Sequence, residues 1–263
     1  MRNMSGSLLT SVENGVATLR LNRPAAMNSF DADTARAIRD AVEGYGADER
    51  VRVLVVGGEG PAFSAGGDFN WVLGWPELDA ITRHAHADAM MGAVQAIYDF
   101  PKPSIARVHG ATVGGGVGLM LACDFAVASS TARFGLTSVR NGLLAGIAIP
   151  VLIDAVGPRV ARQLLMHGGR FDAATALRIG LIDQMVDAQA LDATVAALAG
   201  ELKLGAPSVQ TLVKKLVTQI NALPHDSDAA DILGEQVANQ CVTEDALEGM
   251  RAFLDKRKPR WVM

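Results

Sequence analysis

The sequence is poor in aromatic residues and in cysteine. Aromatic side chains make up 5% of the chain, and the two cysteines, Cys123 and Cys241, are isolated, without disulfide or metal-ligand spacing. No uninterrupted apolar run is long enough to span a bilayer, and nothing near Met1 resembles a signal peptide. We therefore expect a cytoplasmic protein with no metal site and no association with a membrane.

The chain also lacks a strong excess of charge. It has 24 Lys and Arg residues against 28 Asp and Glu residues, for a formal net charge of −4. This balance gives no sign of binding to nucleic acid or to an anionic membrane. Hydrophobic residues make up 49% of the 263 positions, enough for the core of one large domain or of one domain with an extension.

Glycine is concentrated in two loops, each between an expected strand and an expected helix. Gly114, Gly115 and Gly116 follow a predicted buried strand at 104–108 and precede an apolar helix that starts near Val117. Without a Cβ, the backbone is open to a ligand, and the first N–H groups of a helix have no internal partner. Such donors suit an oxygen that carries or develops negative charge. The pattern predicts an anion or oxyanion site, with a packing turn as the alternative.

The same arrangement occurs earlier in the chain, around Gly66 and Gly67. Two sets of backbone donors are what an oxyanion hole requires. The common glycine motifs are missing, because neither loop has the lysine of a P-loop or the Gly-x-Gly-x-x-Gly spacing, and no Gly-x-Ser-x-Gly elbow is present. These exclusions leave an oxyanion hole without an attached nucleophile.

The remaining pattern predicts an α/β portion to about residue 200 and a helical tail. Asn14-Gly15 joins two alternating segments, 8–13 and 16–21, into a hairpin. Helices are expected at 79–99, 147–156, 160–167 and 171–180, and strands at 53–56 and 125–128.

Two motifs of this sequence resemble the crotonase, or enoyl-CoA hydratase/isomerase, superfamily. They are Pro61-Ala-Phe-Ser-Ala-Gly-Gly-Asp68 and Val108-His-Gly-Ala-Thr-Val-Gly-Gly-Gly-Val-Gly-Leu119, and further similar segments extend over nearly the whole chain. The resemblance implies an α/β spiral of ββα units over residues 1–200. Residues 201–263 would be a C-terminal helical region that builds homotrimers, often paired into hexamers.

The resemblance also implies the ligand and most of the site. The family binds acyl-CoA thioesters, so coenzyme A would arrive as part of the substrate, and no permanently bound cofactor is expected. The oxyanion donors would be the N–H groups of Gly67 and Gly115. Ala65 and the loop Ala25–Met27 would contact the adenine end of CoA, and Phe253 and Lys256 would approach its phosphates, from a neighbouring subunit if necessary. The other residues expected around the substrate are Ala25, Met27, Gly66, Asp68, Trp71, Gly114, Gly118 and Arg140.

The sequence departs from the family at two positions. A typical hydratase has glutamates where this chain has Gly118 and Ser138. Glycine has no side chain, and serine needs another base before it can take a proton near neutral pH. The reaction therefore stays open between isomerisation, decarboxylation, C–C cleavage and an atypical hydration.

The segment that follows the first glycine loop carries residues that could replace the missing acids. On a helix, His84 and Asp88 share a face and can form an oriented base, whereas His84 and His86 point apart. The alternative is that these histidines are solvated. Trp71 and Trp75 are expected to shape the acyl pocket.

Two other functions are compatible with the sequence. One is a serine hydrolase on a related spiral fold, which would need Ser64 or Ser138 beside a histidine. The other is a non-catalytic acyl-CoA-binding protein. Fluorophosphonate labelling separates the first from an acyl-CoA enzyme, and turnover of thioesters separates the second.

Overall fold

The computed structural model describes residues 3–223 and 229–262, and its framework is two β-sheets. The larger sheet has the order β1-β2-β3-β4-β6-β8-β11, and the smaller has the order β10-β9-β7-β5. The strands of the larger sheet are β1 (Asn3–Ser5), β2 (Leu8–Glu13), β3 (Val16–Leu21), β4 (Val53–Gly58), β6 (Ser104–Val108), β8 (Phe125–Ser129) and β11 (Gln184–Val186). Those of the smaller are β5 (Ala62–Ser64), β7 (Ala111–Val113), β9 (Arg133–Gly135) and β10 (Arg170–Asp172).

The chain forms a spiral because it alternates between the two sheets. It passes from β4 to β5, from β6 to β7 and from β8 to β9, and a helical segment follows each pair. Neighbouring strands of these turns are parallel, whereas the entry hairpin β2–β3 and the pair β9–β10 are antiparallel. The spiral of ββα units expected from the resemblance is therefore present.

Helices and 3-10 turns connect and cover the strands. The helices up to the end of the spiral are α1 (Ala32–Ala47), α2 (Phe69–Val72), α3 (Ala80–Tyr98), α4 (Gly115–Leu121), α5 (Ile149–His167), α6 (Ala173–Arg178) and α7 (Leu191–Leu202). Those of the tail are α8 (Pro207–Asn221), α9 (Ala229–Cys241) and α10 (Glu244–Leu254). The 3-10 turns are η1 (Pro24–Ala26), η2 (Trp75–Glu77), η3 (Thr137–Asn141), η4 (Gly146–Ala148) and η5 (Ala188–Ala190).

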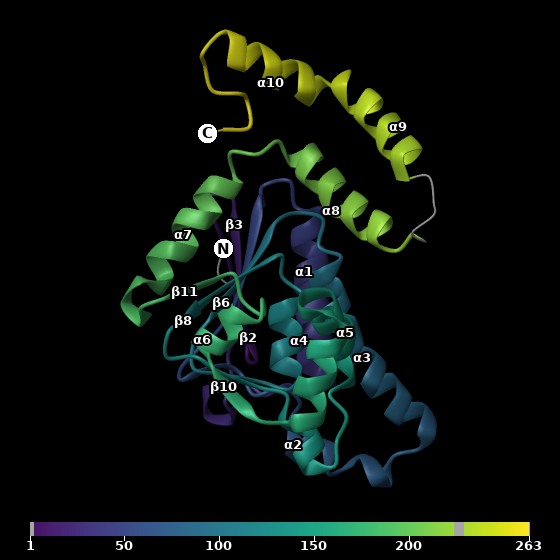
Figure 1. Ribbon diagram of the computed structural model, residues 1–263. Coiled ribbons are helices and arrows are strands. Elements are labelled where there is room, and N and C mark those ends of the chain that lie inside the picture. Colours follow the sequence, from purple (N-terminus) through teal and green to yellow (C-terminus); the bar gives the residue numbers. More distant parts are fainter. Residues whose placement is uncertain (1–2, 224–228, 263) are drawn as a thin grey trace.

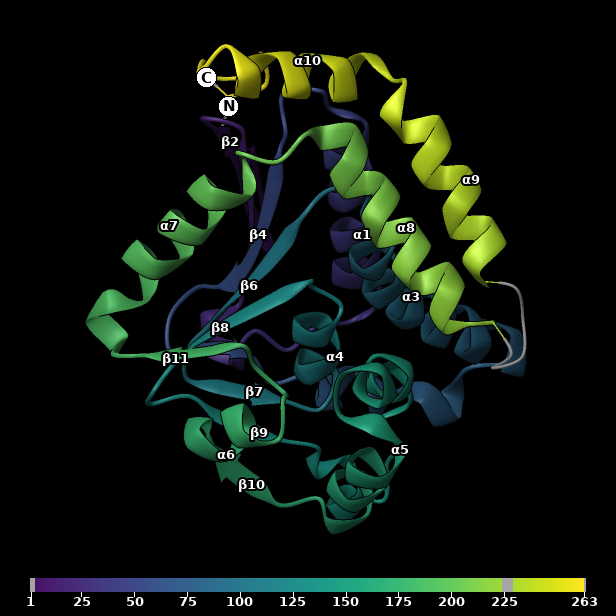
Figure 2. The same cartoon turned by 45° about the horizontal axis from the view of Figure 1, so that its top comes forward.

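The larger sheet is covered on both faces. All six residues of β4 are buried, as expected for a parallel strand with helices on both sides. Figure 2 shows α7 on one side of β4, β6 and β8, with α1 and α3 on the other. Each fully buried Val or Leu side chain contributes about 1.5–3 kcal/mol to folding. The second face is closed by Leu191, Val195 and Ala199 of α7, which belong to one cluster with Val53 and Ile105.

Several predicted elements are confirmed and others needed correction. The hairpin β2–β3 and the strand β6 have the predicted bounds, and Asn14 and Gly15 have the positive φ values of a tight hairpin turn. The two helices expected at 147–156 and 160–167 are one element, α5, broken at Gly157, where φ is +72° and ψ is 163°. The expected helix at 171–180 begins only at Ala173, because the preceding residues pair with β9 as strand β10.

Of the C-terminal helices, α8 packs along the spiral, where the Thr211 hydroxyl donates to the Pro101 oxygen at 2.7 Å, and α9 and α10 lie beyond it (Figure 1). Arg52 ties this tail to the start of β4: its guanidinium donates to the backbone oxygens of Trp261 at 3.0 Å and of Gly205 at 2.7 Å. None of the described helices is both long and apolar enough to cross a membrane.

Candidate active site

The second glycine loop presents a backbone donor at the start of α4. Strand β7 leads into Gly114, which has φ +54° and ψ −119°, a conformation that only glycine adopts without strain. Gly115 is the first residue of α4, so its N–H has no partner within the helix. The Gly115 N–H is thus available to an external acceptor.

The first glycine loop presents a second donor. Phe30 pairs with Gly67 in an isolated parallel bridge, in which the Phe30 N–H donates to Gly66 at 2.8 Å and Phe30 accepts from Asp68 at 3.0 Å. In a parallel bridge one residue, here Phe30, forms both hydrogen bonds with the two neighbours of the residue opposite it. The N–H of that opposite residue, here Gly67, points away. The Gly67 N–H therefore points away from Phe30, and none of the hydrogen bonds found among the described residues uses it.

The fold brings the two glycine loops into contact. A Cβ added to Gly66 would lie 2.6 Å from the Gly115 nitrogen and 2.7 Å from the Val113 oxygen. Gly66 also has a φ of +85°. Gly66, which precedes Gly67, thus lies directly against the Gly115 N–H. Any side chain at position 66 would obstruct that donor.

Buried polar contacts hold the first loop in place. Ser64 is fully buried; its hydroxyl donates to the Asn28 oxygen at 2.8 Å and accepts from the Gly66 N–H at 3.1 Å. Asp68 caps α2 and pairs with Arg23 at 2.8 Å. Because the Ser64 hydroxyl is buried and hydrogen-bonded to two backbone groups, it is not free to act as a hydrolase nucleophile.

The segments expected at the adenine end of CoA lie side by side. The Ala65 N–H donates to the Met27 oxygen at 2.8 Å, so the short turn η1, which contains Ala25, borders the first glycine loop. Met27 closes η1 in the left-handed conformation, with φ +53°.

The two positions at which the family resemblance leads us to expect the hydratase glutamates, 118 and 138, have different surroundings. A Cβ on Gly118 would lie 3.3 Å from both the Ala148 Cα and the Ile147 oxygen, so the 3-10 turn η4 already occupies the space in front of it. The Ser138 hydroxyl, by contrast, lies 3.5 Å from where a Cβ on Gly114 would be. Position 138 therefore borders the second glycine loop, and position 118 faces packed backbone.

The two histidines of α3 lie on different sides of the helix. His84 is 79% exposed and pairs with Asp88 at 3.4 Å, so the predicted pair is present on the solvent side. His86 packs against Trp71, with ring centroids 4.9 Å apart, and one turn later the Met90 Cε lies 3.7 Å from where a Cβ on Gly67 would be.

The inward position of His86 was missed from the sequence. The buried residues of α3 include Met90, Val94 and Ile97, and His86 precedes Met90 by four residues. Tracing this apolar face back by one turn would have reached His86.

Other chemically interesting residues have structural partners. Arg140 is exposed and donates to the His167 oxygen at 3.2 Å. The His109 ring is 2.9 Å from the Gly60 oxygen, and burial lowers the pKa of its imidazole. Burial raises the pKa of the Cys123 thiol, so this cysteine is not a thiolate near neutral pH.

Over residues 3–223 and 229–262, no three His, Cys, Asp or Glu residues gather as a metal site would require.

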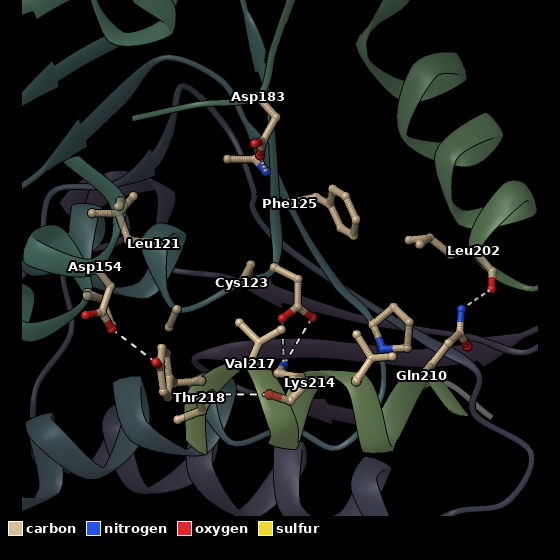
Figure 3. A pocket seen from close by; sticks show the side chains of 18 of the residues that line it. Leu121, Cys123, Phe125, Asp154, Asp183, Leu202, Gln210, Lys214, Val217 and Thr218 are labelled. Carbon is tan, nitrogen blue, oxygen red and sulfur yellow. Dashed lines mark hydrogen bonds and ion pairs between the residues drawn. The ribbon is translucent and has the colours of Figure 1, made fainter. Parts of the chain in front are cut away.

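A large cavity lies elsewhere, between α8 and the spiral. It has a volume of about 690 Å³ and is bordered by the C-terminal end of α4, opposite the end at which Gly115 lies. Figure 3 shows Lys214 and Asp154 on its walls, where Lys214 pairs with Asp124 at 2.9 Å and Asp154 accepts from Tyr98 at 3.0 Å. Because Lys214 pairs with Asp124, and Asp154 and Asp183 accept hydrogen bonds from Tyr98 and from the Ala126 N–H, the cavity is a weaker candidate for the reaction site than the glycine loops.

Phe253 and Lys256 are remote from the glycine loops of the same chain. They lie at the end of α10, and the segment that follows is held by Arg52 at the beginning of β4. The glycine loops follow the other ends of β4 and β6, and Figure 1 shows α10 and α2 at opposite ends of the molecule. These two residues can approach such a site only on another copy of the chain.

The fold is thus a spiral in which two glycine loops lie against each other, each with a backbone N–H that has no partner among the described residues. The family model described as enoyl-CoA hydratase/isomerase matches residues 11–263, so the chain belongs to this family and has the crotonase fold.

Its relatives include proteins with different named reactions. It is 32% identical to a crotonyl-CoA hydratase of Syntrophomonas wolfei, over 97% of this chain and 98% of that one. It is 28% identical to a trans-2-decenoyl-[acyl-carrier-protein] isomerase of Streptococcus mutans, over 97% of both chains. Among solved structures, an enoyl-CoA hydratase from Shewanella pealeana matches with a TM-score of 0.92 and 31% identity, over 97% of this chain and 96% of that one.

Proposed function

We propose that the protein binds an acyl-CoA thioester with the thioester oxygen between the Gly67 and Gly115 N–H groups, and converts it through an enolate. The contact between the two glycine loops supports this proposal, since the loop with the unpartnered Gly67 N–H lies against the loop with the unpartnered Gly115 N–H. When a base, for which His84 beside Asp88 is the predicted candidate, takes the proton from the carbon next to the thioester, the electron pair of the C–H bond moves toward the carbonyl. The negative charge then develops on the oxygen that both donors hold.

The CoA portion would run along the first glycine loop. The hydrogen bond between Ala65 and Met27 supports an adenine site there, because it keeps η1 next to the loop that carries Gly67. The left-handed turn at Met27 leaves that side chain partly exposed at the same place. CoA thus enters as part of the substrate.

The expected reaction does not need the pair of hydratase glutamates. Gly118 and Ser138 supply no carboxylate, which disfavours rapid hydration and leaves isomerisation by another base, decarboxylation and C–C cleavage open. His84 and Arg140 stay predictions as contributors. Their glutamine variants, assayed for turnover, measure what each contributes.

The test of this function is exchange of the proton next to the thioester. Wild-type protein incubated in D₂O with a panel of saturated and unsaturated acyl-CoAs should introduce deuterium at that carbon, detectable by mass spectrometry. Binding of thioesters without exchange or turnover of any panel member would instead identify a non-catalytic acyl-CoA-binding protein. Labelling of a serine by a fluorophosphonate would favour the hydrolase.

We further propose that residues 201–263 assemble the protein into a trimer or hexamer. The support is apolar surface that the single chain leaves exposed: Val213 and Val217 on α8 are 53% and 65% exposed, and Phe253 on α10 is 81% exposed. A neighbouring copy would cover such surface and bring Phe253 and Lys256 to the CoA phosphates.

A substitution at Lys256 tests this arrangement. Lys256→Ala should weaken binding of CoA more than binding of 3′-dephospho-CoA, because the ammonium would make a charge-assisted contact to the 3′-phosphate. Titration calorimetry measures both affinities, and light scattering on the same sample reports the oligomer. Equal losses for the two ligands would remove Lys256 from the phosphate site, and a monomer at micromolar concentration would contradict the assembly.

A further inference from the structure

Two buried nitrogen atoms without hydrogen-bond partners lie in one aromatic cluster. They are Nε1 of Trp75 and Nδ1 of His86, and among the described residues the only other such side-chain atom is Oγ1 of Thr112. The His86 ring packs on Trp71 at 4.9 Å and on Trp75 at 6.0 Å, and the two indoles meet edge to face at 5.1 Å. A buried polar atom without a partner carries a free-energy penalty, so two in one cluster require an explanation.

The cluster lies next to the first glycine loop. Trp71 is on α2, four residues after Gly67, and His86 is one turn of α3 before Met90, whose Cε lies 3.7 Å from where a Cβ on Gly67 would be. One helical turn advances about 5.4 Å. An acyl chain whose thioester oxygen is held by Gly67 therefore reaches the cluster with its middle or distal carbons.

Packing alone does not account for these residue types. The two indoles fix the imidazole in place, yet the Trp75 N–H and the His86 nitrogen do not bond to each other. Phenylalanine or leucine would fill the same space without leaving a polar atom unsatisfied. Trp71 and Trp75 are carried by α2 and η2, which are only four and three residues long, and Leu73 between them is 77% exposed. A ligand would reach the two nitrogens by a shift of these short elements relative to His86 on α3.

We propose that Trp75 and His86 bind a hydrogen-bonding oxygen on the acyl group, beyond its β carbon. This inference rests on the proposed function and names its substrate class: acyl-CoAs with a hydroxyl or carbonyl oxygen on the middle or distal part of the chain. The Trp75 N–H donates to that oxygen. The His86 nitrogen accepts from a hydroxyl in one neutral tautomer and donates to a carbonyl in the other. Trp71 packs against the carbons that carry the oxygen.

The experiment compares matched pairs of thioesters. Butanoyl-, pentanoyl- and hexanoyl-CoA are each titrated beside the analogue that carries a terminal hydroxyl, with wild-type protein and calorimetric detection. For at least one chain length the hydroxylated member should bind about 10- to 100-fold more tightly. A site built to hydrogen-bond an oxygen disfavours the ligand that lacks it, because its own polar groups then stay unpaired.

Two variants identify the residues responsible. Trp75→Phe removes the indole N–H and His86→Leu removes the imidazole, and each should bring the affinity ratio within a pair toward one. The unsubstituted thioester is titrated against the same variants, and only a loss that is larger for the hydroxylated member of a pair reports a lost hydrogen bond. If a variant lowers the affinity of both members equally, its residue only packs, and the inference is wrong for that residue.

The wild-type titrations decide the question even if a variant does not fold. Equal affinities within every pair would overturn the oxygen site and leave the proposed function standing, provided that the unsubstituted thioesters bind. If no thioester binds at all, the proposed function is itself overturned. The two failures are therefore distinguishable.

Discussion

Replacing Gly115 with proline is expected to lower thioester turnover about 10²–10³-fold relative to Gly115→Ala, the range observed when an oxyanion hole loses one donor. Proline fits the first position of a helix, where the N–H has no internal partner, so α4 should persist. What proline removes is the N–H itself. The measurement is kcat/KM, or the rate of deuterium exchange next to the thioester.

The alanine variant is the matched control for this prediction. A Cβ at position 115 would lie 2.7 Å from the Ile147 Cδ1 and 3.2 Å from the Phe30 Cζ, and both substitutions introduce it. The contact of the Cβ is therefore common to both variants, and Ile147 can move its terminal methyl group, whereas proline alone replaces the N–H donor with an apolar Cδ. Similar rates for the two variants would show that the Gly115 N–H does not hold the reacting oxygen.

Local signals predicted much of the fold and both glycine loops. The Asn14-Gly15 turn by itself predicts the hairpin β2–β3. Helix α3 could be predicted because its segment is long and begins with a capping residue, Asp79. Strands β10 and β11 were missed because each has three residues and exists only by pairing with β9 and β8. A three-residue segment has no periodicity that distinguishes a strand from a turn.

The site was less predictable where it depends on contacts between distant segments. Nothing local shows that Gly66 lies against the nitrogen of Gly115, 49 positions later in the chain. The i, i+4 spacing of His84 and Asp88 correctly predicted a pair, but spacing does not reveal which face of α3 is buried. The packing of α3 decides this, and it turns His86 rather than His84 toward Trp71.

Wild-type protein is expected to hydrate crotonyl-CoA about 10²–10⁴-fold more slowly than a family member with both glutamates, which is the contribution of positioned acid–base groups. Gly118 and Ser138 supply no carboxylate, while the donors of Gly67 and Gly115 remain to bind the thioester. The protein should thus bind the substrate but add water poorly. The check is the loss of enoyl-CoA absorbance at saturating substrate.

The structure shows which glutamate can be restored. The Ser138 hydroxyl lies 3.5 Å from where a Cβ on Gly114 would be, so Ser138→Glu brings a carboxylate to the second glycine loop and should raise the hydration rate. Ser138→Gln introduces a side chain of nearly the same size without the acid, and should not raise the hydration rate.

Gly118→Glu must displace η4, because its Cβ alone would lie 3.3 Å from backbone atoms of that turn. Overpacking of this kind costs about 1–3 kcal/mol, so we expect a lower Tm from Gly118→Glu rather than a faster reaction. Wild-type hydration at the rate usual for the family would contradict the assignment of positions 118 and 138, and another residue, with His84 tested first, would then be the acid–base group.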